Sequence, residues 1–122
     1  EREGSGYKPF AESINRTEDI LIRIQELLPN NTPLLIFSTH DDYPYWKAIG
    51  DLCEKLEIPF VGYLPQEIRA SEEQGQNTRA LDGAHWNELG HQIAAHILAC
   101  EMIDILETKT DVSKEVFSLN KK

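Results

Sequence analysis

Two short apolar runs with an amphipathic stretch between them constrain the fold of this sequence most. The first run, residues 34–39, follows Pro33, and its apolar character is typical of a strand that is buried on both faces. The second run is residues 60–64, and between the two runs residues 43–56 place apolar side chains at helical spacing. Strand, helix and strand in this order predict a βαβ unit, whose strands pair in parallel through a right-handed crossover.

Helical periodicity also appears on either side of this unit. Residues 13–28 repeat apolar side chains at helical spacing and end at Pro29, residues 66–81 are polar and predict a loop, and residues 86–106 predict a long final helix. Two strands are too few for an independent parallel sheet with helices on both faces. We therefore expect the sheet to be completed by a missing N-terminal half, or by a second copy of the chain that pairs through the exposed sheet edge.

Composition disfavours two classes of partner. The sequence of 122 residues has a formal net charge of −9 with scattered basic residues, whereas phosphate binding needs clustered Lys and Arg, so we expect no nucleic-acid partner. No run approaches the ~20 apolar residues of a membrane span. The longest candidate, residues 93–106, is interrupted by His96, Glu101 and Asp104, so we expect no membrane span in this chain.

The cysteines and the helical histidines do not predict a metal site. Cys53 and Cys100 lie in helical apolar patterns and are interpreted as buried free thiols, with a disulfide between them as the alternative. His91 and His96 are five residues apart, so they lie about 140° apart around a helix axis and cannot face the same ion. We expect His91 to pack or cap near the start of its helix, and we expect no metal and no cofactor.

Residues 82–91 give the strongest indication of chemistry. Asp82 and His85 are separated by two residues, and Gly83 between them permits an unusual turn before the final helix. A carboxylate that accepts the Nδ1 proton of an imidazole fixes its tautomer and leaves Nε2 free to take a proton from a hydroxyl nucleophile. The spacing alone also fits Asp82 as a turn residue or a helix cap.

The run Asp-Gly-Ala-His-Trp-Asn-Glu-Leu-Gly-His at residues 82–91 resembles the last motif block of the SGNH/GDSL hydrolase superfamily. In that family Asp-x-x-His is followed by Asn and by Gly-His at the opening of the C-terminal helix. The resemblance spans residues 10–106 and implies the α/β class, with a flavodoxin-like three-layer α/β/α fold and a parallel sheet. It implies that residues 10–107 are the C-terminal half of such a domain, between a linker or truncation end at residues 1–9 and a charged tail at residues 108–122.

The resemblance implies that His85 is a general base and Asp82 its orienting carboxylate, in a serine-dependent ester hydrolase or acyl transferase. The substrate implied is a small-molecule or carbohydrate acyl ester, and the location implied is extracytoplasmic. The family's Gly-Asp-Ser nucleophile motif and its Gly-x-Asn-Asp motif are absent from the sequence. We therefore expect a fragment, one of two chains or a reduced hydrolase, inactive by itself. A non-catalytic binding or structural module is the alternative.

A second candidate site follows the first predicted strand. His40, Asp41 and Tyr43 come after residues 34–39, at the carboxyl end of a predicted parallel strand, where open α/β sheets bind ligands. The pattern favours a polar turn that leads into the next helix, and the functional alternative is a substrate-lining loop made of these three residues. Trp46 is predicted to pack on the core face of that helix.

Overall fold

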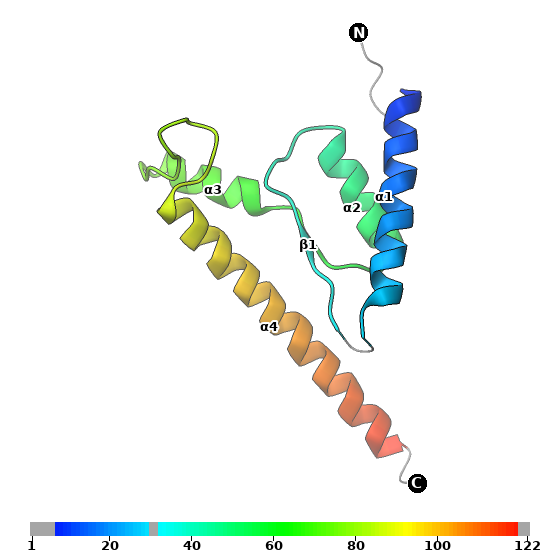
Figure 1. Ribbon diagram of the computed structural model, residues 1–122. Helices are drawn as coiled ribbons and strands as arrows, with labels where there is room; N and C mark the ends of the chain where they lie inside the picture. The colour runs from blue at the N-terminus through cyan, green and yellow to red at the C-terminus, as the bar shows by residue number, and fades with distance from the viewer. Residues whose placement is uncertain (1–6, 30–31, 120–122) are drawn as a thin grey trace. The chain divides into compact units, whose positions relative to one another are not determined.

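The computed structural model describes residues 7–29 and 32–119 and divides the chain into two compact units, Glu1–Gln66 and Glu67–Lys122. Figure 1 shows the elements, which are α1 (Lys8–Leu27), β1 (Ile36–Phe37), α2 (Tyr45–Lys55), β2 (Phe60–Val61), α3 (Leu64–Glu73) and α4 (Glu88–Leu119). The boundary between the two units falls within α3.

The first unit contains a parallel pair of strands. Ile36 of β1 pairs with Phe60 of β2, and Phe37 pairs with Val61. The backbone N–H of Ser38 donates a hydrogen bond to the carbonyl oxygen of Val61 at 3.1 Å. The predicted parallel pairing of the two apolar runs is therefore confirmed, although each strand is only two residues long.

The core of the first unit is formed by α1, α2 and the strand pair. Leu21 of α1, Leu52 and Cys53 of α2, and Ile58 before β2 are buried together. Burying an aliphatic side chain of this kind contributes about 1.5–3 kcal/mol to folding, so this cluster holds the two helices side by side (Figure 1). Partly buried apolar side chains surround it, namely Leu34, Ile36, Ile49, Leu56 and Phe60.

The second unit consists of the C-terminal part of α3, a connecting segment and α4. An antiparallel bridge between Arg79 and Trp86 closes a short loop before α4. Inside this loop the N–H of Ala80 donates to the carbonyl oxygen of His85 at 2.9 Å. Gly83 has a φ of 72°, a left-handed conformation that glycine adopts without steric cost, so the chain can turn sharply between Asp82 and Ala84.

The expected flavodoxin-like three-layer α/β/α fold is wrong. The described residues are mostly helical, and their only sheet is the pair β1–β2. A three-layer fold needs a sheet wide enough to receive helices on both faces, and a sheet of two strands with two residues each does not provide one.

The loop predicted for residues 66–81 is wrong in its first part, where α3 forms. Leu64 and Ile68 are buried and lie four residues apart, so they share one face of this helix. The other helices are confirmed with changed ends: α1 begins earlier than predicted, at Lys8, and α4 begins two residues later and continues to Leu119. Of the linker expected at residues 1–9, residues 1–6 lie outside the described residues.

Helix α4 extends through most of the segment that was expected to form a charged tail. Among the described residues, one segment, Glu88–Thr108 of α4, is long and apolar enough to cross a bilayer by length and composition. A core helix of a soluble protein passes the same test, so one such helix is weak evidence of a membrane span.

The two cysteines are free thiols, as predicted, but they differ in burial. Cys53 is buried in the core of the first unit, and this burial raises the pKa of its thiol. Cys100 is exposed on α4, so the prediction that it is buried was wrong. Apolar residues near it in the sequence suggested burial, but successive residues of a helix point in different directions, and residue 100 lies at an exposed position of the second unit.

Candidate active site

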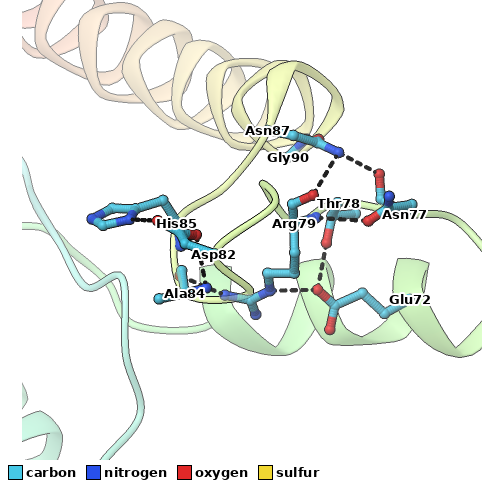
Figure 2. Close-up of polar contacts among 9 residues, drawn as sticks. All are labelled: Glu72, Asn77, Thr78, Arg79, Asp82, Ala84, His85, Asn87 and Gly90. Atoms are coloured by element: carbon cyan, nitrogen blue, oxygen red, sulfur yellow. Dashed lines mark hydrogen bonds and ion pairs between the residues drawn. The ribbon is translucent and has the colours of Figure 1, made fainter.

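Asp82 and His85 lie on the short loop between α3 and α4 and contact each other directly (Figure 2). The distance between Asp82 Oδ2 and His85 Nδ1 is 2.5 Å. The other carboxylate oxygen, Oδ1, accepts hydrogen bonds from the backbone N–H groups of Ala84 at 3.0 Å and His85 at 3.1 Å. The predicted hydrogen bond between the two side chains is confirmed, although its length is slightly below the expected range of about 2.6–3.2 Å.

These hydrogen bonds determine the protonation of the pair. The His85 side chain and then the two backbone N–H groups lower the pKa of the Asp82 carboxyl to about 2. Asp82 is therefore ionised at neutral pH and can only accept, so the proton between the two side chains belongs to His85 Nδ1. In the neutral imidazole Nε2 then has a free lone pair, and the His85 side chain is 82% exposed.

Asn87 fixes the start of α4 next to this loop. It is the N-cap residue of the helix, and its side-chain oxygen accepts the N–H of Gly90 at 3.1 Å. Its side-chain nitrogen donates to the carbonyl oxygens of Asn77 at 2.7 Å and Arg79 at 3.1 Å. The Asn that follows Asp-x-x-His in the sequence therefore joins the helix to the segment that precedes the loop (Figure 2).

Gly90 permits a close approach of the same segment to α4. A Cβ atom at this position would lie 2.7 Å from the carbonyl oxygen of Thr78 and 2.9 Å from Trp86 Cβ. Both distances are shorter than a Cβ atom tolerates, so a residue with a side chain would clash here. The ring of His91 packs edge-on against that of Trp86, with 5.9 Å between the ring centroids. His91 thus packs near the helix start, as predicted.

A polar cluster that the sequence did not predict supports the loop from α3. Thr78 is fully buried, and its hydroxyl donates to Glu72 Oε1. Arg79 Nε donates to the same oxygen at 2.6 Å, and Arg79 Nη1 donates to the carbonyl oxygen of Ala84 at 3.3 Å. Hydrogen bonds from Thr78 and then Arg79 lower the pKa of Glu72, so this carboxylate stays ionised. These residues fall in the stretch predicted as a loop, and no periodic pattern identifies them.

The second candidate site is a pocket of about 510 Å³ in the first unit, at the carboxyl end of β1. His40 lines the pocket, and its Nδ1 lies 2.9 Å from Thr39 Oγ1. Asp41 and Tyr43 are not among the lining residues: Asp41 Oδ2 accepts a hydrogen bond from Gln66 at 3.3 Å, and Tyr43 is 73% exposed. The remaining lining residues are mostly aromatic or hydroxyl-bearing, namely Phe37, Ser38, Thr39, Asp42, Tyr45, Trp46, Ile49 and Phe60.

Within the part of the chain that the structure describes, no group of three or more His, Cys, Asp and Glu side chains is arranged to hold a metal ion. No family model, curated protein or solved structure matches this chain. The geometry of the loop that holds Asp82 and His85 is therefore the main basis for assigning a function.

Proposed function

We propose that this chain provides the acid–base pair of a serine-dependent ester hydrolase or acyl transferase. The observation that supports this most directly is the 2.5 Å contact between Asp82 Oδ2 and His85 Nδ1, with His85 Nε2 left as the basic atom. The resemblance of residues 82–91 to the last SGNH/GDSL motif supports the same chemistry. It supports the site and not the three-layer fold.

In the proposed reaction His85 Nε2 takes the proton of a serine hydroxyl as the serine oxygen attacks the acyl carbon of the ester. Asp82 stabilises the resulting imidazolium, which then gives its proton to the leaving alkoxide as the ester bond breaks. Water or a sugar hydroxyl attacks the acyl-serine in the same way and releases an acid or a new ester. Because the sequence contains no Gly-Asp-Ser, the serine is expected from residues outside these 122.

One observation favours the alternative, a non-catalytic binding or structural module. Asp82 Oδ1 accepts two backbone N–H groups of its own loop, so this carboxylate has a structural role that requires no chemistry. In such a module His85 would be an exposed partner of a turn residue. The two functions differ in whether a serine becomes reactive through His85.

The test is to treat the natural gene product that contains these residues with a fluorophosphonate, which labels activated serines. We expect labelling of one serine, and a rate about 10²–10⁴-fold lower in His85→Ala, the usual contribution of a general base. His96→Ala is the matched control, because His96 is an exposed histidine of α4, and it should label normally. Absence of labelling, or labelling that His85→Ala leaves unchanged, would reject the hydrolase and favour the non-catalytic module.

A further inference from the structure

We propose that Arg79 is a positioning residue for the Asp82–His85 pair, held in place by Glu72 and Thr78. The proposal rests on the proposed function only for what the pair does, since the contacts that define it lie within the second unit. They form an unbroken series from helix α3 to the histidine ring (Figure 2).

The series begins at a single carboxylate oxygen of α3. Glu72 Oε1 accepts two hydrogen bonds, one from the buried hydroxyl of Thr78 and one from Arg79 Nε at 2.6 Å. The guanidinium also donates from Nη1 to the carbonyl oxygen of Ala84 at 3.3 Å. The N–H of His85, which belongs to the same peptide unit as this carbonyl, donates to Asp82 Oδ1 at 3.1 Å, so the guanidinium bridges α3 to a peptide unit that binds the orienting carboxylate.

The side chains of this loop have little apolar packing that could position the Asp82–His85 pair in place of Arg79. All of residues 81–85 are exposed, and a Cβ at Gly83 would meet no atom within 4 Å. Thr78 is buried and Arg79 is partly buried, so Arg79 lies between the buried part of this segment and the exposed loop. Besides the carboxylate of Asp82 itself, the guanidinium of Arg79 is the charged side chain that binds the backbone of this loop, and such charge-assisted hydrogen bonds are stronger than neutral ones.

The backbone of Arg79 is held independently of its side chain. It bridges to Trp86, and its carbonyl oxygen accepts the side-chain N–H of Asn87 at 3.1 Å. A change confined to the guanidinium should therefore leave the second unit folded. Arg79→Lys keeps the positive charge and the ion pair with Glu72, but an ammonium lacks the planar fork that reaches two acceptors in fixed directions.

The experiment compares the wild-type chain with Arg79→Lys by NMR. In the wild type the Asp82 carboxyl should titrate near 2, and neutral His85 should have its proton on Nδ1. In Arg79→Lys we expect the pKa of Asp82 to rise towards its ordinary value and the Nδ1–H form of His85 to lose population. Arg23→Lys is the matched control, since it alters an exposed Arg–Glu pair of 2.7 Å in α1 and should change neither signal.

A folded Arg79→Lys chain with unchanged Asp82 titration and His85 tautomer overturns the proposal. So does loss of folding in Arg79→Lys, because Arg79 would then act on the fold rather than on the pair. In the natural gene product Arg79→Lys should also slow serine labelling about 10²-fold, the effect of a misplacement near 1 Å. If the wild type labels no serine while the NMR signals of Arg79→Lys shift as expected, the hydrolase fails and the positioning role of Arg79 stands.

Discussion

At the scale of single residues, Asp82 uses its two carboxylate oxygens differently. Oδ2 contacts the imidazole, and Oδ1 closes the loop by accepting two backbone N–H groups. Each of these contacts favours the ionised carboxylate, which is why the pKa of Asp82 falls to about 2. The same residue therefore couples the structure of the loop to the protonation of the pair.

This coupling predicts a pH dependence of stability. An unfolded Asp has a pKa near 3.9, so between about pH 4 and about pH 2 the unfolded chain binds more protons at residue 82 than the folded chain, whose pKa is about 2. The contribution of Asp82 to the free energy of unfolding is fully present above about pH 4 and is lost as the pH falls towards 2.

Asp82→Asn should therefore show a shallower loss of stability across this range than the wild type, measured by urea unfolding at a series of pH values. Asp19→Asn, which changes an exposed aspartate of α1, should keep the wild-type slope. Equal slopes for Asp82→Asn and wild type would show that the loop does not hold the carboxylate in its ionised form.

The sequence predicts only part of this site. Asp82 and His85 are close in the chain, so their contact follows from a spacing of three residues with a glycine between them. The contacts of Glu72 with Thr78 and Arg79 cross from a helix to a loop that follows it, and their geometry depends on where that helix ends. Since α3 was not predicted, this cluster could not be predicted either.

At the scale of secondary-structure elements, the sequence predicts both strands and each described helix except α3, but not the lengths of these elements. Residues 34–39 and 60–64 have the apolar character of buried strands and pair in the predicted direction, yet only Ile36–Phe37 and Phe60–Val61 form the sheet. A run of residues becomes a regular strand only where a neighbouring strand pairs with it. The length of each strand therefore cannot be predicted from one apolar run alone. Helix α3 was missed because its burial depends on a pair of residues, Leu64 and Ile68, within a largely polar segment.

The start of α4 gives a prediction about element packing. Gly90→Ala would place a Cβ at 2.7 Å from the Thr78 carbonyl oxygen and 2.9 Å from Trp86 Cβ, and neither is the flexible end of a side chain. We expect the free energy of unfolding of the second unit to fall by about 1–3 kcal/mol, the usual cost of overpacking. Denaturant titration of amide NMR signals from residues 78–91 measures this change.

The control for this substitution is Gln92→Ala, two residues along the same helix. Gln92 is exposed, and its side chain contacts Glu88 on the helix surface, so its replacement should change stability by no more than about 0.5 kcal/mol. If Gly90→Ala is as stable as Gln92→Ala, the segment around Thr78 does not pack on α4 as closely as the structure has it.

At the scale of the whole molecule, the motif at residues 82–91 did not determine the fold. A motif of ten residues specifies a loop and a helix start, whereas the number of strands in a sheet depends on the whole chain. The expectation that a missing N-terminal half or a second copy completes the sheet stays a prediction at this scale. Phe37 is 44% exposed, and within the described residues neither β1 nor β2 pairs with a third strand.

Because no third strand pairs with β1 or β2 among the described residues, we predict that the 122-residue chain self-associates. A strand with a free edge and an exposed aromatic side chain is a template for pairing with another chain, and covering apolar surface contributes about 25 cal/mol per Å². Other large apolar side chains are also exposed, among them Ile20, Leu27, Met102, Ile103 and Leu106. We expect a mass above that of a monomer in sedimentation experiments at micromolar concentration, together with binding of a hydrophobic dye.

Phe37→Lys should lower this association, because a charge on an edge strand opposes pairing with a second sheet. Tyr43→Lys introduces the same charge at a residue that is exposed outside the strands, so it serves as the control and should associate like the wild type. If both variants associate equally, the contact between copies does not involve β1. A wild-type chain that sediments as a monomer, unfolds cooperatively and binds no dye would show instead that its two-stranded sheet needs no further partner.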